Sequence, residues 1–286
     1  MNGLVVVNYN DYKNTISFIK SVSDFNCINY IVIVDNCSTD GSFDELKKIC
    51  SDNVFLIKNV SNKGYGSGIN LGSRFLIENY GVKNIIVSNT DIIIHSNDDI
   101  RKMLDYLDND VALVGPTIIE NNNFNRGWKI PSVWDDVLLN IPFIHRWLRK
   151  KLLFYKDSYY SSDFSIVEAL SGCFFIVRSD VLVDVGFFDE NIFLYYEENV
   201  IAVKLRNTHY LSFVINGVNV IHNHSVTIDN SIGRIKKFKI LKKSQKYFHK
   251  NYSNCSIFGI FFLNLTYLFM LGFLYIDVFF HNLFKK

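Results

Sequence analysis

The chain has 286 residues, which is enough to bury a large core in one or two domains. Its 25 Phe residues and only 3 Pro exclude a chain dominated by disordered linkers. The net charge is only +2, but it divides into about −7 before Asn230 and +9 from there on, where ten Lys and Arg stand against one acid, Asp277.

Apolar segments alternate with amphipathic ones from the first residues onward. Strands are predicted at 3–10, 30–36, 54–59 and 84–89. Helices are predicted at 11–23, from about Ser42, at 65–79 and at 96–107, where a Ser or Asn provides the cap. Strands that are apolar throughout and separated by helices indicate an α/β fold with a mostly parallel sheet and helices on both faces.

Each of these strands finishes in polar side chains. The four ends read Asn8-Tyr9-Asn10, Asp35-Asn36, Asn59 and Asn89-Thr90-Asp91. One polar strand end is ordinary turn chemistry. Because ligands bind outside the carboxyl ends of parallel strands, four of them together predict a polar crevice.

Asp91 ends what is predicted to be a central strand. A carboxylate there is suited to a hard divalent cation, Mg²⁺ or Mn²⁺, whose other ligands would be water and diphosphate oxygens. The alternative is that Asn89 and Asp91 only form a turn.

The glycine-rich segment 62–72, NKGYGSGINLG, follows the third strand. Its backbone could approach a nucleotide closely, but it lacks the Lys-Ser/Thr of a P-loop. The first strand also has no glycine turn. These two absences argue against a nucleoside triphosphatase and a nicotinamide dehydrogenase.

After a strand at 111–116, the segment 120–164 is less regular and contains all three Trp residues. It is interpreted as an insertion on the acceptor side of a site, with an ordinary surface excursion as the alternative. Regular structure is expected again from 167 to 225.

Four acids lie within ten residues of the segment FFDENIFLYYEEN, 187–199: Asp189, Glu190, Glu197 and Glu198. On a solvated helix they would be unremarkable. The aromatic residues between them place some carboxylates near apolar surface, which raises a carboxyl pKa and favours a general base.

The C-terminal part, 230–286, carries eight Lys and Arg over 234–250 and then the apolar segment 256–276. That segment is about as long as a bilayer is thick. It is interpreted as membrane-associating, whether as an in-plane anchor or a span, with a soluble core helix as the alternative. An apolar segment directly after the basic one favours a membrane over nucleic acid as the anionic partner.

The five cysteines have no paired metal-binding spacing and are odd in number, so free thiols in a reducing compartment are expected. The N-terminal residues lack a basic n-region, and no signal peptide is expected.

The motifs VVVNYN, VIVDNCSTDGS, NKGYGSGINLG, SNTD, GCFFIVRSDVLVDVGFFDENIFLYYEE and VIHNHS occur in that order over about residues 3–225. This order resembles the inverting glycosyltransferases of family 2, especially their rhamnosyltransferase-like bacterial branch. The resemblance implies a GT-A fold over 1–229, a nucleoside-diphosphate-sugar donor and a divalent metal, Mn²⁺ or Mg²⁺.

The resemblance also assigns roles to individual residues. Those expected near the nucleotide are Asn8, Tyr9, Asp35, Ser38, Asp40, Gly64 and Asn70. The expected metal residues are Asn89 and Asp91, in an N-x-D form of the family's D-x-D motif, with His222 and, less strongly, His224. Glu198 matches the general base, with Glu197 beside it.

Two departures from the family pattern concern the base. Relatives often read E-D-x-D where this chain has Glu197-Glu198-Asn199-Val200, so the last acid is absent and the base is one methylene longer. The alternative function is therefore a catalytically impaired protein of the same fold that binds a sugar nucleotide or a glycan.

A nucleoside diphosphate leaves as an anion, so a metal can stabilise it without a proton donor. One base, Glu198, then suffices, and inversion at the anomeric carbon is expected. The predicted function is transfer of a sugar, with rhamnose favoured, to a lipid-linked saccharide in O-antigen or capsule synthesis. The expected location is the cytoplasmic face of the plasma (inner) membrane, with no nucleic-acid partner.

Overall fold

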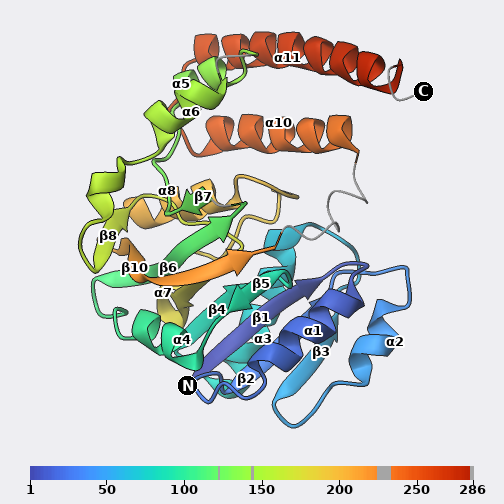
Figure 1. Cartoon of the computed structure of the whole chain (residues 1–286), viewed down its shortest axis with the longest axis vertical. Helices are drawn as coiled ribbons and strands as arrows, with labels where there is room; N and C mark the ends of the chain where they lie inside the picture. Colours follow the sequence, from blue (N-terminus) through green and yellow to red (C-terminus); the bar gives the residue numbers. More distant parts are fainter. Residues whose placement is uncertain (122, 143–144, 224–232, 284–286) are drawn as a thin grey trace.

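The computed structural model describes residues 1–121, 123–142, 145–223 and 233–283 (Figure 1). The elements of the first half are β1 (Asn2–Asn8), α1 (Tyr12–Val22), β2 (Tyr30–Asp35), α2 (Ser42–Lys47), β3 (Val54–Lys58), α3 (Tyr65–Tyr80), β4 (Asn84–Ser88), β5 (Ile92–Ile94) and α4 (Asn97–Leu104). The predicted strands and helices of this half are thus confirmed to within a few residues. Ser96 caps α4 as predicted, because its Oγ accepts a hydrogen bond from the backbone N–H of Asp99 at 3.2 Å.

The second half is less regular. Its elements are β6 (Val111–Glu120), β7 (Asn123–Asn125), α5 (Val133–Leu139), α6 (His145–Leu153), the 3₁₀ helix η1 (Asp157–Tyr160), β8 (Phe164–Val167), β9 (Phe174–Arg178), α7 (Ser179–Asp184), α8 (Glu197–Arg206), β10 (Leu211–His222), α10 (Arg234–Asn251) and α11 (Ile257–Leu283). Strand β6 continues four residues beyond the strand predicted at 111–116.

The strands form one sheet in the order β3-β2-β1-β4-β9-β6-β10-β5. Strands β3, β2, β1 and β4 are parallel, as predicted, because helical crossovers connect them. Beyond β4 the sheet is mixed, since β9 pairs antiparallel to both β4 and β6 while β10 runs parallel to β6. The carboxyl ends of β1, β2 and β4 therefore share one edge.

Both faces of the sheet are covered, as the continuous apolar strands predict. On one face Leu4 and Val6 of β1 pack with Phe18 of α1. On the other face Val5 packs with Ile69 and other residues of α3. Alternate side chains of one strand thus enter two cores, which is why the strand has no polar face.

Strand β5 was not predicted, and it changes how the segment 84–94 is understood. After β4 the chain turns at Asn89-Thr90-Asp91, and Ile92–Ile94 then pairs antiparallel to the end of β10. Three residues are too few to show strand periodicity, so only the tertiary pairing reveals the strand. Asp91 consequently lies between β4 and β5, next to β10.

Helices α10 and α11 lie one above the other at one end of the molecule, with α11 outermost (Figure 1). The segment 120–164, whose interpretation as an acceptor-side insertion stays a prediction, contributes α5 to this end, where Val133 and Val137 pack against Leu263 of α11. The window 257–280 of α11 has a mean hydropathy of 2.1 and is only 17% buried, which is unlike a soluble core helix. Its length and composition would suit a span or an in-plane anchor. The predicted boundary between 229 and 230 lies outside the described residues.

Candidate active site

The ends of β1 and β2 bring together three of the residues predicted to lie near the nucleotide. Asn8 and Asp35 are register partners of the two parallel strands. The Asn8 side chain donates to Asp35 Oδ1 at 2.9 Å and to Ser38 Oγ at 3.1 Å, and the Ser38 backbone N–H donates to Asp35 Oδ2 at 3.1 Å. Asn8 and Asp35 are buried, so their side chains are held in place below the surface at the ends of these strands.

Two further predicted residues flank this cluster. Tyr9 is 40% exposed, so its ring is open to a ligand. Asp40 instead accepts hydrogen bonds from the backbone N–H and hydroxyl of Ser42, at the start of α2. The described contacts of Asp40 are therefore those of a loop-forming residue, and its contact with a nucleotide stays a prediction.

Gly64 and Asn70 hold the acidic segment in place. Gly64 has φ +105°, and a Cβ there would lie 2.1 Å from the carbonyl oxygen of Phe193. Asn70 is buried; its amide bonds the backbone N–H and C=O of Phe188 at 3.0 and 2.9 Å and Glu190 Oε1 at 3.0 Å. The glycine-rich segment thus packs against 188–193, while a role in nucleotide binding stays a prediction.

Asp91 lies beside His222, as the metal prediction requires. Asp91 Oδ1 is 3.2 Å from His222 Nε2, and Glu120 Oε1 is 3.3 Å from His222 Nδ1. Burial opposes protonation of His222, but the hydrogen bond and charge of Asp91, together with Glu120, outweigh it and raise the His222 pKa.

Glu120 was missed by the sequence analysis. The predicted strand ended at 116, so Glu120 was assigned to the insertion rather than to a strand end. The signal that could have found it is the apolar run Thr117-Ile118-Ile119, which continues the strand before a polar residue.

The donor groups near Asp91 fit a divalent cation. Within the described parts of the chain no group of three or more His, Cys, Asp or Glu side chains is arranged as a metal site. A largely buried carboxylate beside an imidazole nevertheless suits Mn²⁺ when phosphate oxygens and water complete the coordination, whereas Mg²⁺ would use the carboxylate alone. Asn89 lies in the same turn as Asp91, two residues before it. His224 lies outside the described residues.

Glu197 and Glu198 form the first turn of α8. Glu198 Oε1 accepts a hydrogen bond from the backbone N–H of Gly172 at 3.2 Å, whereas the buried Glu197 Oε2 has no hydrogen-bond partner among the described residues. Burial raises the pKa of both carboxyls, and the charge of Glu198 raises that of Glu197 further. This agrees with the apolar surroundings that the aromatic residues predict.

The segment around Gly172 and Cys173 connects the two halves of the site. The Asn89 backbone N–H donates to the Cys173 carbonyl at 2.8 Å, one residue after the Gly172 amide that bonds Glu198. Tyr65 donates its hydroxyl to the Gly172 carbonyl at 3.1 Å.

Burial raises the Tyr65 pKa well above its ordinary value, and the charges of Cys173, Glu197, Glu198 and Asp91 add to this effect. The hydrogen bonds to Cys173 and Gly172 link the turn that contains Asp91 to the Glu198 carboxylate through two adjacent residues. This is the arrangement that a shared reaction site requires.

Comparison with known proteins gives matches of sequence and of fold. The family model for Glycosyl transferase family 2 matches residues 4–186. The low-salt glycan biosynthesis hexosyltransferase Agl10 of Haloferax volcanii is 25% identical over 228 residues, covering 78% of this chain and 67% of that protein. The dTDP-rhamnosyl transferase RfbF of Shigella flexneri is 29% identical over 220 residues, covering 76% and 67%.

Two solved structures illustrate the fold. The structure of GalNAc-T7 with UDP, GalNAc and Mn²⁺ matches with a TM-score of 0.58 at 14% identity. The match covers 78% of this chain but only 43% of the GalNAc-T7 chain. The mannosyltransferase PcManGT of Pyrobaculum calidifontis, in complex with GDP-Man and Mn²⁺, matches with a TM-score of 0.57 at 13% identity. The match covers 95% of this chain and 72% of the PcManGT chain. At such identities the likeness shows the fold alone, and it confirms the predicted GT-A class.

Proposed function

We propose, from the premise that this chain belongs to glycosyl transferase family 2, that it transfers a sugar from a nucleoside diphosphate to a saccharide acceptor with inversion. Membership is shown by the family model and confirms the resemblance predicted from the order of the motifs. The names of the two relatives, a hexosyltransferase and a dTDP-rhamnosyl transferase, support a hexose or deoxyhexose, with rhamnose favoured.

The observation that carries the proposal is the junction at Gly172 and Cys173. One side of it bonds the turn that holds Asp91, and the other bonds Glu198. A donor diphosphate beside Asp91 would therefore have its anomeric carbon within reach of an acceptor hydroxyl beside Glu198. Such prearranged proximity supplies much of the rate enhancement in group transfer.

Glu198 is the proposed general base. Its raised pKa strengthens it as a proton acceptor, and its bond from Gly172 leaves the second carboxylate oxygen to receive the proton of the acceptor hydroxyl. The acceptor oxygen attacks the anomeric carbon as the bond to the diphosphate breaks on the opposite face. One base is enough, because the leaving group departs as an anion and needs no proton.

Asp91 and His222, with Asn89, are the residues that would hold a divalent cation. When bound, the cation supplies positive charge that stabilises the leaving diphosphate. Glu120 bonds the far nitrogen of His222 and so directs Nε2 towards Asp91.

The departures from the E-D-x-D pattern have structural counterparts. Asn199 Oδ1 accepts a hydrogen bond from Trp128 Nε1 at 2.9 Å, and Val200 is buried beside Phe248 of α10. These positions thus contribute packing in place of a charge, while Glu198 retains the base carboxylate. A binding protein without activity remains the alternative.

Membrane association completes the proposal. Many large apolar side chains of α11 are exposed, including Phe258 at 73% and Phe269 at 64%. Basic residues of α10, such as Lys236, Lys239 and Lys243, are exposed next to it. Apolar surface beside positive charge suits an anionic leaflet and hence a lipid-linked acceptor, at the cytoplasmic face of the plasma membrane during O-antigen or capsule synthesis.

The deciding experiment is a panel of UDP-, dTDP- and GDP-sugars screened by thermal shift with Mn²⁺. The best donors are then incubated with saccharide-lipid acceptors, and the anomeric configuration of the product is determined by NMR. An inverted glycoside supports the proposal. Donor binding without release of nucleoside diphosphate on any acceptor would favour the non-catalytic alternative, and a retained configuration would exclude Glu198 as the single base.

A further inference from the structure

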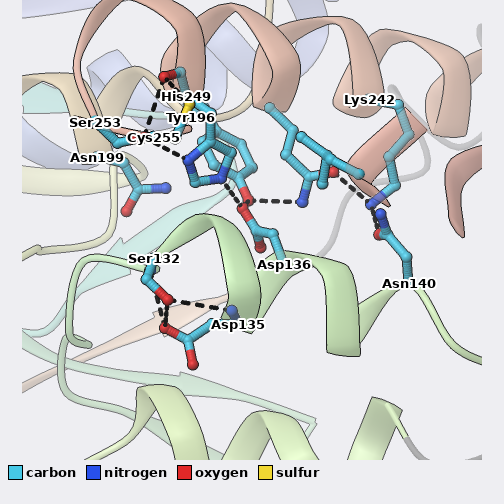
Figure 2. A network of polar contacts seen from close by, with 12 residues as sticks. Ser132, Asp135, Asp136, Asn140, Tyr196, Asn199, Lys242, His249, Ser253 and Cys255 are labelled. Atoms are coloured by element: carbon cyan, nitrogen blue, oxygen red, sulfur yellow. Dashed lines mark hydrogen bonds and ion pairs between the residues drawn. The ribbon is translucent and has the colours of Figure 1, made fainter. Parts of the chain in front are cut away.

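A buried polar network joins the C-terminal helix α10 to the residue that precedes the catalytic pair. Figure 2 shows Asp136 of α5 pointing towards His249 of α10 and towards the hydroxyl of Tyr196. Asp136 is 3% exposed and His249 is 0% exposed, so neither side chain meets water. Burying a carboxylate without partners would cost folding free energy. The contacts of Asp136 therefore favour a fixed arrangement of α5, α10 and the residue before α8.

The bonds of this network converge on one carboxylate oxygen. His249 Nε2 lies 2.6 Å from Asp136 Oδ2, and its Nδ1 lies 2.8 Å from Ser253 Oγ. Tyr196 donates its hydroxyl to the same Oδ2 of Asp136. Gln245 of α10 in turn donates to the Tyr196 hydroxyl at 3.0 Å, so α10 reaches Tyr196 by two routes.

Tyr196 needs such an anchor because of its backbone. Its φ is +72°, and that of Tyr195 is +68°, so two adjacent non-glycine residues occupy the left-handed region. Such conformations persist only when the surrounding structure holds them. Tyr196 is the residue immediately before α8. Its position therefore determines the positions of Glu197 and Glu198 in the first turn of that helix.

Other contacts of α10 hold the same segment. Ser244 donates its hydroxyl to the Leu194 carbonyl at 2.8 Å. Tyr247 of α10, and Tyr252 directly after its end, donate to Asp189 Oδ2 at 2.8 and 2.6 Å. The basic helix therefore packs directly on the acidic segment 189–198, although in sequence it belongs to the membrane-associating part.

We infer that His249 and Asp136 are positioning residues that fix Tyr196, and through it the Glu198 carboxylate, so that helix α10 is a structural part of the active site. This inference rests on the proposed transferase function with Glu198 as base. It implies that the position of the membrane-associating end of the chain and the position of the proposed base depend on each other. Changes in α10 then affect turnover more than they affect donor binding.

The test uses full-length variants that remove single groups from the network. His249→Leu removes one of the two partners of Asp136 Oδ2, and Tyr196→Phe removes the other, the hydroxyl that also accepts from Gln245. Both should lower kcat by roughly 10- to 100-fold while leaving the donor KM nearly unchanged, because a displaced base impairs the chemical step and not ground-state binding. His249→Gln restores a donor to Asp136 and should recover most of the lost kcat.

The matched control is Tyr159→Phe. Tyr159 donates its hydroxyl to a backbone carbonyl, that of Ile166, at 2.8 Å in η1 and away from the network. This variant should retain wild-type kcat. If His249→Leu and Tyr196→Phe also keep wild-type kcat, or if His249→Gln is as impaired as His249→Leu, the inference is wrong.

Hydrogen exchange separates this inference from the proposed function. Peptides covering 193–200 should exchange faster in His249→Leu and Tyr196→Phe, with α1 and α3 unchanged. That result would support the positioning role even if the wild-type protein transferred no sugar from any donor. Unchanged exchange in 193–200 would overturn it, whatever the activity.

Discussion

The backbone N–H of Gly172 donates to Oε1 of Glu198 at 3.2 Å, and a Cβ at position 172 would lie 2.8 Å from that same oxygen. The close approach and the hydrogen bond are thus two aspects of one contact. Any side chain at 172 must displace the proposed base. The glycine is needed here for space and not for backbone conformation.

Gly172→Ala should therefore lower kcat by roughly 10- to 100-fold, because a shift of about 1 Å in a reacting group can cost this much. Gly217→Ala is the matched control, since a Cβ at 217 would meet nothing within 4 Å. Steady-state kinetics with the best donor measures both variants. Equal kcat for the two would show that Glu198 is not the group that limits the reaction.

Glu198→Gln should keep donor binding but lower transfer by roughly 10²- to 10⁴-fold, the contribution of a general base. The amide can still accept the hydrogen bond from Gly172, so the loop should keep its place. Donor affinity is measured by thermal shift and turnover by release of nucleoside diphosphate. Undiminished turnover would mean that another group takes the acceptor proton.

Asp91→Ala should abolish the part of donor affinity that depends on Mn²⁺. The carboxylate is a proposed ligand beside His222, and its loss leaves too few donor groups for the cation. Calorimetric titration of the donor with Mn²⁺ and with a chelator measures the difference. If donor affinity is equally metal-dependent in Asp91→Ala, the cation binds elsewhere.

Glu197→Gln should stabilise the fold by about 1–3 kcal/mol near pH 8, because it removes an acid whose ionisation is opposed by burial and by the charge of Glu198. The sign follows from the raised pKa of Glu197. Above an unfolded pKa of about 4.3 the unfolded chain loses the proton while the folded chain retains it, so stability falls as pH rises towards the folded pKa.

The advantage of Glu197→Gln over the wild type should accordingly grow from pH 5 to pH 8. Urea unfolding at both values measures it, with Glu78→Gln, an exposed glutamate of α3, as the control. An advantage that shrinks with pH would contradict the raised pKa of Glu197.

Replacing Phe258, Phe261 and Phe269 together by Ser should abolish flotation with vesicles that contain phosphatidylglycerol. These rings are 73%, 59% and 64% exposed on α11, and burying such surface in the interface provides the binding free energy. Phe124→Ser is the control, because Phe124 is 61% exposed on β7, outside the C-terminal helices. Flotation of the triple variant at the wild-type level would remove the argument for a lipid-linked acceptor.

Features that depend on local pattern could be predicted from the amino-acid sequence. The apolar strands and the intervening helices predicted the first half of the sheet, because periodicity and capping act within a few residues. The polar strand ends Asn8, Asp35 and Asp91 were likewise recognisable, since parallel strands must bring their carboxyl ends to one edge. The order of the motifs then indicated the family, and it predicted Glu198 as the base.

Tertiary structure alone decided how these residues are held. Gly172 bonds Glu198 across 26 positions of sequence, and His249 reaches Asp136 across 113. Glu120 meets His222 only because β6 and β10 are neighbours in the sheet. No local pattern encodes such pairs, because each depends on where the folded chain brings distant elements together. For that reason composition predicted a membrane-associating basic C-terminal segment but not its contacts with the acidic segment 189–198.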